Sequence, residues 1–210
     1  MHFERLIASS TSASDIQDFV AAYRDAFGGA PYFETYSDEY IRDEVLIPHL
    51  ENGLVVVARD NGHVVGFGCT VPVYSSPPDV MEYIKKLSTE PGLPSDLALE
   101  RTWYMSELGT VTTYRLRGVA YQVVRSRLIS VSHMGGLFYF MRTAKEGSNS
   151  RHLYARIGAL PIGQPQNVGG LRVTKDSSSR SLERQYMYGR VSDGLEAVLG
   201  RIRESADTSC

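Results

Sequence analysis

The sequence predicts an α/β or α+β domain in which helices cover both faces of a central β-sheet. Two β-rich runs, over residues 54–59 and 63–73, are joined by Asp60-Asn61-Gly62, and Asn-Gly between such runs is the strongest short-range hairpin signal. Both arms are almost continuously apolar, as is typical of strands covered on both faces. A switch from a strand pattern to a helix pattern between residues 103 and 132 adds a further βα unit.

Composition bounds the class of protein. With 210 residues, of which 42% are hydrophobic and 22% charged, the chain can bury a full core, and one domain over residues 1–210 is expected. The net charge of −2 gives no long-range attraction to nucleic acid or to an anionic membrane. Cys69 and Cys210 form neither a disulfide framework nor a metal-ligand spacing. With no secretory signal and no apolar run of ~20 residues, a soluble protein of the cytoplasm is expected.

The elements expected before the hairpin are a strand and two helices with an aromatic loop between the helices. Their positions are residues 3–7 for the strand, Ser14 or Asp15 to Gly28-Gly29 for the first helix, 30–37 for the loop, and Ser37 or Asp38 to Leu50 for the second helix. The long segment 74–101 follows the hairpin, and its apolar spacing predicts a short amphipathic helix over residues 79–87 between two Pro-rich loops.

The central stretch combines a strand and a helix. Residues 103–111 are rich in aromatic and β-branched side chains, and apolar residues recur at helical spacing from Val119 to Val131. Between them lies Arg115-x-x-Gly118-x-Ala120. A small-residue turn that enters a helix leaves the first amide N–H groups unpaired, with the positive end of the helix dipole behind them. The turn therefore suits a phosphate or pyrophosphate, although a glycine there also serves simply to let the chain turn.

The elements expected after the central helix alternate again between strands and helices. They are a strand over residues 137–143, a helix capped within 147–150 and closed by Gly158, a loop over 161–170, strands over 171–174 and 184–188 around a polar turn at 175–181, and a final helix from Ser192 or Asp193 that buries Leu195, Val198, Leu199 and Ile202.

Two blocks, taken in this order, resemble the GNAT superfamily of N-acyltransferases. The first is Glu107-Leu108-Gly109-Thr110-Val111 followed by Arg115-x-x-Gly118-x-Ala120 and a helix, and the second is Leu153-Tyr154-Ala155-Arg156-Ile157-Gly158. Thr112 stands where the family commonly has proline, and Ala159 where it usually has phenylalanine. The resemblance implies a mixed, mostly antiparallel central sheet of about seven strands flanked by helices. It also implies a splayed parallel pair, formed by the strand ending near Val111 and the strand through Phe140, that holds coenzyme A.

The resemblance assigns two chemical roles. Tyr154 is expected to protonate the departing thiolate, because a phenol is a suitable proton donor there, and Glu107 corresponds to the residue that acts as general base in some members. Each residue has an ordinary alternative. Tyr154 can pack against the sheet with its hydroxyl satisfied elsewhere, and Glu107 can order water or pair with Arg101 or Arg115.

Binding residues follow from the same resemblance. The aromatic residues of the first interhelical loop are expected to border the acceptor pocket, with ordinary core packing as their alternative. The insertion over residues 74–101 is hypothesised to cover or shape that pocket. The assigned residues are Leu108, Thr110, Val111, Arg115, Arg117, Gly118, Val119, Ala120 and Asn149 for coenzyme A, and Tyr32, Phe33 and Tyr36 for the acceptor.

The resemblance predicts transfer of an acyl group, acetyl in particular, from acetyl-CoA or another acyl-CoA to an amine of a small-molecule acceptor, with no metal. The nearly neutral net charge disfavours polycationic acceptors. Three alternatives stay open: an acyl carrier protein as donor, an aminoacyl-tRNA as donor, which would be the one nucleic-acid partner, and a catalytically silent acyl-CoA-binding module. The sequence leaves a homodimer open.

Overall fold

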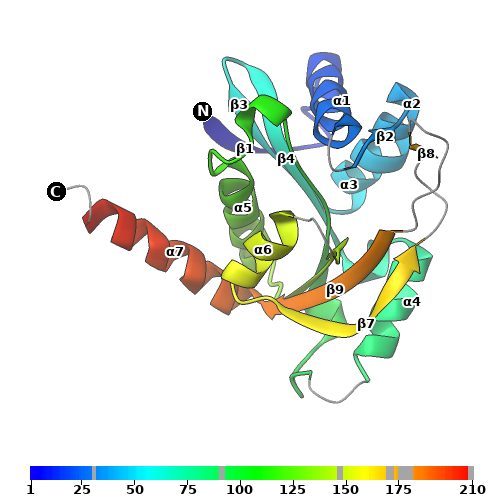
Figure 1. The fold of residues 1–210 in the computed structure, drawn as a ribbon, viewed down its shortest axis with the longest axis vertical. Coiled ribbons are helices and arrows are strands. Elements are labelled where there is room, and N and C mark those ends of the chain that lie inside the picture. The colour runs from blue at the N-terminus through cyan, green and yellow to red at the C-terminus, as the bar shows by residue number, and fades with distance from the viewer. Residues whose placement is uncertain (30–31, 90–92, 146–148, 169–172, 175–181, 208–210) are drawn as a thin grey trace.

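A seven-stranded sheet in the order β1-β3-β4-β5-β6-β9-β7 forms the centre of the computed structural model, which describes residues 1–29, 32–89, 93–145, 149–168, 173–174 and 182–207 (Figure 1). The pairs are antiparallel except for β5 with β6, which is parallel. The predicted mixed, mostly antiparallel sheet is therefore confirmed. Its strands are β1 (His2–Leu6), β3 (Leu54–Asp60), β4 (His63–Pro72), β5 (Thr102–Thr110), β6 (Phe138–Ala144), β7 (Leu160–Val168) and β9 (Leu182–Arg190).

The β3–β4 hairpin follows from the two residues at its tip. Asn61 and Gly62 have φ values of 50° and 86°, the left-handed pair that a type I′ turn requires. Asp60 pairs with His63 on either side of the turn. Both arms are buried nearly throughout, as their continuous apolar character predicts.

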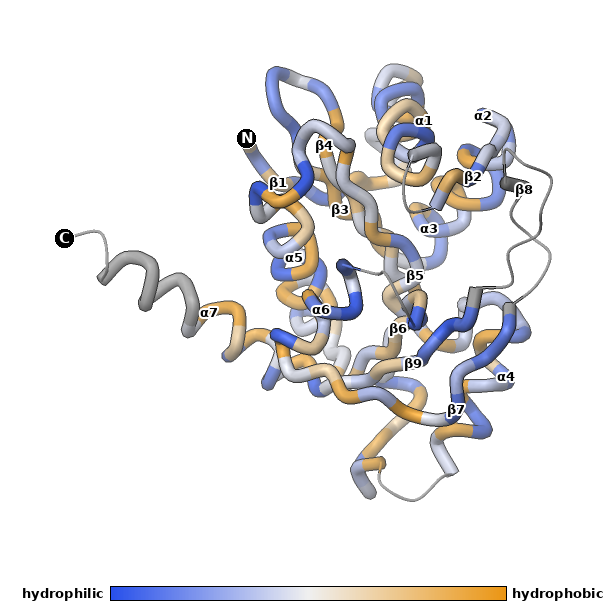
Figure 2. Tube along the Cα trace, viewed as in Figure 1, coloured by the Kyte–Doolittle hydropathy of each residue, from blue (hydrophilic) through white to orange (hydrophobic). Residues whose placement is uncertain are grey.

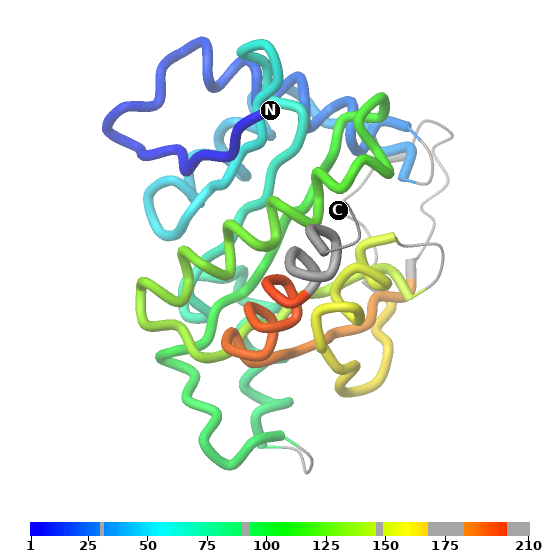
Figure 3. Tube along the Cα trace, turned by 90° about the vertical axis from the view of Figure 1, so that its left-hand side faces the viewer, coloured from blue at the N-terminus to red at the C-terminus, as the bar shows by residue number. Residues whose placement is uncertain are grey.

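The helices cover the two faces of the sheet, as Figures 1 and 3 show. Apolar residues of β3 and β4 lie between α1 on one face and α5 on the other (Figure 2). On the α1 face lie α1 (Ala13–Gly28), α2 (Asp38–Tyr40), a π-helical turn (Ile41–Leu46), α3 (Ile47–Asn52) and α4 (Pro78–Leu87); on the other lie α5 (Val119–His133), α6 (Asn149–Arg156) and α7 (Val191–Asp207).

The first helix starts earlier than the sequence pattern suggests. Ser12, rather than Ser14 or Asp15, is its N-cap. The Ser12 hydroxyl accepts from the Asp15 amide at 3.2 Å, and the Asp15 carboxylate accepts from the Ser12 amide at 2.9 Å. This reciprocal capping box satisfies two donors at once.

The α4 segment matches the predicted amphipathic helix. Val80, Ile84 and Leu87 are fully buried, and they share a core with Tyr104 of β5 and Phe140 of β6. The insertion is therefore an integral layer over the sheet, close to the parallel strand pair.

Two expectations for the C-terminal part are wrong. The segment predicted as a loop over 161–170 contains β7, which tolerates Pro161 and Pro165 because it lies at the edge of the sheet. Leu199 is exposed rather than buried, because α7 leads away from the sheet (Figure 1).

Other C-terminal expectations agree in part: the strand predicted over 184–188 lies within β9, and Leu195, predicted to be buried, is half-buried. Val198 is buried in the core, as predicted for the final helix. A two-residue strand, β8 (Val173–Thr174), pairs with β2 (Glu34–Thr35). The predicted turn at 175–181 and the side chain of Ile202 lie outside the described residues. In the portion of the chain that the structure describes, no helix combines the length and apolar character needed to cross a bilayer.

Candidate active site

The parallel strands β5 and β6 are hydrogen-bonded over only part of their length. Thr102, Trp103 and Tyr104 of β5 pair with β6, and the ladder ends where Tyr104 meets Phe140. Beyond that point β5 continues to Thr110 and stays paired with β4 alone. In the second half of β5, which includes Glu107, the backbone groups on the edge facing β6 therefore have no ladder partner in β6.

An irregularity between β4 and β5 lies next to this unpaired edge. Cys69 pairs with Glu107 and Val71 with Tyr104, so β5 has one residue more than β4 across this step. The Cys69 carbonyl lies 3.1 Å from Ser106 Oγ and accepts a side-chain hydrogen bond from Arg127. At the bulge, the Cys69 carbonyl is therefore accessible to side chains on both faces of the sheet.

The turn before α5 has the conformation of an anion site. Gly118 is the N-cap, with φ 79° and no side-chain cap, and Leu116 also has a positive φ of 61° and is 97% exposed. The first helical hydrogen bond runs from the Gln122 amide to the Gly118 carbonyl at 3.1 Å. The amides of the first turn therefore have no intrahelical partner, and the helix dipole favours an anion in front of them.

Side chains anchor this turn to the end of α1 and to the hairpin. Arg115 Nη2 donates to the Ala26 carbonyl at 2.8 Å, and the Thr112 amide donates to Asp25. Arg117 lies 5.4 Å from the centre of the Tyr114 ring. The turn is thus held in place while Arg117 stays at the surface.

The residues assigned to coenzyme A form a continuous path from β5 into α5. Leu108 and Thr110 are half-buried at the end of β5, Val119 is buried and Ala120 half-buried at the start of α5. Thr110 Oγ1 is buried and has no hydrogen-bond partner among the described residues. Asn149 begins α6 and is exposed.

Tyr154 projects from α6 into the core beneath the sheet and is only 2% exposed. Arg127 Nη1 donates to its hydroxyl at 3.1 Å, and Arg127 is the one hydrogen-bond partner of this hydroxyl among the described residues. Burial holds the pKa of Tyr154 above its usual range; Arg127 opposes that rise and Glu107 adds to it. Tyr154 therefore stays protonated at neutral pH, and its proton is not committed to an acceptor within the described residues.

Glu107 faces the opposite side of the sheet. Its Oε2 accepts from the Tyr23 hydroxyl of α1 at 3.2 Å. The expected alternative of an ion pair with Arg101 or Arg115 is not observed, because their guanidinium groups donate to the carbonyls of Gly135 and Ala26. Glu107 is half-buried, so a carboxylate lies at the unpaired half of β5 without a cationic partner in ion-pair contact among the described residues.

His49 of α3 adds a polar group beside Glu107. Its Nδ1 lies 2.5 Å from the Val45 carbonyl and its Nε2 lies 2.6 Å from Ser106 Oγ. Burial lowers the pKa of His49, with Glu107 opposing the shift and Arg127 adding to it. The neutral imidazole then donates from Nδ1 to Val45 and accepts at Nε2. Both ring nitrogens of His49 therefore have a hydrogen-bond partner.

The three aromatic residues assigned to the acceptor have different environments. Tyr36 is buried, its ring centre lies 5.5 Å from that of Tyr23, and its hydroxyl donates to Glu34 at 2.9 Å. Tyr32 packs edge-on against Phe27 at 5.3 Å. Phe33 is 46% exposed and has a positive φ of 51°. Tyr36 thus has the core role that was its alternative, and Phe33 alone of the three presents a free apolar surface.

A family model described as the acetyltransferase (GNAT) family matches residues 16–159, which is more than half of the chain. The chain belongs to the GNAT acetyltransferase family. The match spans the Gly118 turn, Glu107 and Tyr154, and its last residue is Ala159, where the family usually has phenylalanine. No curated protein matches this GNAT chain in sequence.

Solved structures share the fold at low identity. An N-acetyltransferase from Staphylococcus aureus Mu50 has a TM-score of 0.63 and 14% identity, covering 91% of this chain and 99% of that one. A ribosomal-protein-alanine N-acetyltransferase from Brucella melitensis has a TM-score of 0.62 and 13% identity, with 90% and 99% covered. YncA of Salmonella typhimurium, solved with its cofactor acetyl-CoA, has a TM-score of 0.60 and 13% identity, with 91% and 95% covered. At these identities the likeness establishes the GNAT fold alone.

The structure adds residues that the sequence pattern did not single out. Tyr23 and Arg127 contact the two assigned catalytic residues, and Arg142 lies on β6 past the end of its ladder with β5. One signal was available in the sequence: Arg127 stands on the same predicted helix face as Val123 and Leu128, where a charge is unexpected. Among the described residues, no group of histidine, cysteine or acidic side chains is arranged to hold a metal ion.

Proposed function

We propose that this GNAT protein is an N-acyltransferase that moves an acyl group, acetyl in particular, from acyl-CoA directly to an amine of a small molecule. The observation that carries the proposal is the Gly118 turn, whose outward amides follow directly on the strand edge that β6 leaves unpaired. A nucleotide-linked pantetheine needs an anion site and a run of free backbone groups next to each other. The partnerless Thr110 Oγ1, buried between these two features, also fits a polar ligand.

The two assigned side chains reach the strand separation from opposite faces. Bound acetyl-CoA supplies an acyl carbon activated as a thioester. Glu107, on the α1 face, is placed to take a proton from the attacking amine directly or through a water. Tyr154, on the α5 face, is placed to protonate the sulfur that leaves, and its raised pKa keeps the phenol protonated until then. No covalent enzyme intermediate is required.

A thermal-shift series tests the donor. Acetyl-CoA at 100 times its Kd should stabilise the fold by about 2.7 kcal/mol, which corresponds to about 5–10 °C in Tm for a chain of this size. Free coenzyme A and longer acyl-CoAs supply the comparison. A shift with acetyl-CoA but no transfer to any amine would favour the silent acyl-CoA-binding module. No shift with any coenzyme A species would contradict the proposal and turn attention to carrier-protein or aminoacyl-tRNA donors.

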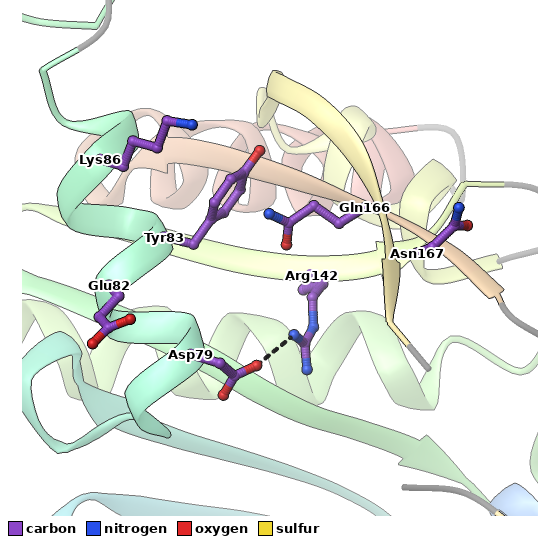
Figure 4. A pocket seen from close by; sticks show the side chains of 7 residues that line it. All are labelled: Asp79, Glu82, Tyr83, Lys86, Arg142, Gln166 and Asn167. Carbon is purple, nitrogen blue, oxygen red and sulfur yellow. Dashed lines mark hydrogen bonds and ion pairs between the residues drawn. The ribbon is translucent and has the colours of Figure 1, made fainter. Parts of the chain in front are cut away.

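A polar pocket between α4 and the edge of the sheet supports a small acceptor and a direct role for the insertion. The cavity has a volume of about 680 Å³ (Figure 4). Arg142 forms its β6 side, two residues beyond the last pair with β5, and donates to Asp79 at 3.3 Å. The lining residues are Asp79, Glu82, Tyr83, Lys86, Arg142, Gln166 and Asn167. We place the acceptor here, because Arg142 and Glu107 lie on the same face along the two arms of the separated strand pair.

The Arg142→Met variant tests this placement. Losing a charged hydrogen-bond donor should raise the KM for the acceptor by about 10-fold or more, while the KM for acetyl-CoA stays unchanged. The measurement uses the best amine from a panel of amino acids, diamines and arylamines. Arg42→Met is the matched control, since Arg42 is exposed and pairs only locally with Asp43. Equal acceptor KM values for the two variants would remove the acceptor from this pocket.

A further inference from the structure

Arg127 is a buried cation in the middle of α5. The residue has 0% exposure and is the largest fully buried side chain among the described residues. No carboxylate lies within ion-pair distance of it in the described part of the chain. Its guanidinium donates instead to Thr70 Oγ1 at 2.7 Å, to Tyr154 Oη at 3.1 Å and to the Cys69 carbonyl. All three of these partners are neutral oxygens.

The sheet is shaped to receive this side chain. A Cβ at Gly68 would lie 2.6 Å from Arg127 Cδ and 2.8 Å from Val123 Cγ1, so glycine leaves the room that the arginine occupies. The bulge between β4 and β5 supplies the Cys69 carbonyl as an acceptor. Burying a charge without a carboxylate partner is costly, and an apolar residue on this helix face would avoid that cost. Helix packing alone therefore does not account for Arg127.

The contact with Tyr154 has a directional consequence. Because Arg127 Nη1 donates to the phenol oxygen, the Tyr154 proton must point away from the guanidinium. Arg127 is itself held by Thr70 and Cys69, so the orientation of the phenol is fixed through the sheet. The other titratable side chains that interact electrostatically with Arg127 or Tyr154 include Glu107, His49, Cys69 and Tyr139.

We propose that Arg127 is a positioning residue for acyl transfer, which directs the Tyr154 proton towards the leaving sulfur and stabilises the phenolate that proton transfer creates. The inference rests on the proposed function and adds to it a residue outside the family motif. Tyr154 gives its proton as the carbon–sulfur bond breaks, and the electron pair of that bond stays on sulfur. The nitrogen that forms the new bond to carbon loses one proton to Glu107, which balances the one delivered to sulfur. Glu107 then releases its proton to solvent and the Tyr154 phenolate regains one, so both residues return to their starting states. Arg127 stays protonated throughout and acts only through Tyr154.

Arg127→Met and Arg127→Lys test the proposal. Methionine keeps much of the volume but neither donors nor charge, and it should lower kcat about 10²-fold, the lower end of what a positioned proton donor contributes, with both KM values unchanged. Lysine keeps the charge and should restore part of the loss. Turnover by Arg127→Met equal to that of the parent protein would overturn the proposal.

A readout independent of turnover uses tyrosine labelled with ¹³C at the ring carbon that bears oxygen. The Tyr154 resonance is identified as the one missing from Tyr154→Phe, and it should move in Arg127→Met. It should stay in place in the control Arg125→Met, because Arg125 lies on the same helix but donates to Gln122 in the parent protein. An unmoved Tyr154 resonance in Arg127→Met would contradict the hydrogen bond and with it the proposal.

Thr70→Val decides the matter if the Arg127 variants do not fold. It removes one of the oxygens that hold the guanidinium, and the loss of one hydrogen bond should lower kcat about two- to tenfold without a change in either KM. Unchanged kcat in a folded Thr70→Val, together with an unmoved Tyr154 resonance, would overturn the proposal. Failure of the proposed function is distinguishable from failure of this inference. It would be observed in the parent protein, as no stabilisation by acetyl-CoA and no acyl transfer.

Discussion

Tyr154→Phe is expected to lower kcat by about 10²- to 10⁴-fold and to leave the affinity for acetyl-CoA unchanged. The phenol reaches the strand separation from the α5 face, and its proton is not donated to any acceptor within the described residues. Phenylalanine keeps the ring that packs in the core but cannot protonate the leaving sulfur. Turnover under saturating substrates and donor affinity by calorimetry measure the two quantities separately.

The same variant carries a stability cost that a surface hydroxyl would not. Arg127 Nη1 loses its acceptor in a fully buried place, and an unsatisfied buried donor costs about 1–3 kcal/mol of unfolding free energy. Denaturant unfolding measures this cost, with Tyr121→Phe as the comparison. In the parent protein the Tyr121 hydroxyl makes a half-buried hydrogen bond to the Val198 carbonyl at 3.2 Å. If Tyr154→Phe turned over at the parental rate, Tyr154 would have only its structural role.

Glu107→Gln is expected to lower kcat/KM by about 10²-fold or more. The attacking amine must give up a proton as the new bond to carbon forms, and the Glu107 carboxylate is the group proposed to accept it. Glutamine keeps an oxygen for the Tyr23 hydroxyl at nearly the same position but cannot take a proton. The variant should therefore be folded but slow, as denaturant unfolding and kcat/KM at a fixed pH will measure.

Glu100→Gln is the matched control, since Glu100 is exposed just before β5. Its kcat/KM should equal that of the parent protein. Should Glu107→Gln retain the parental kcat/KM, Glu107 would be a structural carboxylate held by Tyr23, and the general base would have to be sought elsewhere.

Local patterns in the sequence account for most of the secondary structure. Asn61-Gly62 predicts its hairpin because the turn needs two left-handed residues, which are set by the residues themselves. The edge strand β7 was missed because Pro161 and Pro165 read as loop until pairing with β9 places them at the edge of the sheet. The exposure of Leu199 likewise depends on whether another element faces α7, which periodicity does not report.

The candidate site likewise combines features that are local in sequence with contacts between residues far apart in sequence. The Gly118 turn and the Leu153-Tyr154 block are contiguous in sequence, so their patterns predicted an anion site and a candidate proton donor. The partners of the catalytic candidates are remote in sequence: the hydrogen bond from Tyr23 to Glu107 spans 84 residues. Sequence spacing contains no information on such a contact, because the register of the sheet and the crossing of the helices decide it.

The sequence by itself determined the order of the elements as far as α6, the type I′ hairpin, the turn that opens α5 and the family pattern around Tyr154, because each depends on residues that are neighbours along the chain. Only the tertiary structure decided that β5 leaves β6 at Tyr104, that a bulge frees the Cys69 carbonyl and that Arg127 lies against Tyr154. Those features arise where separate segments meet, and close packing of strands against helices is the physical reason that they have one arrangement.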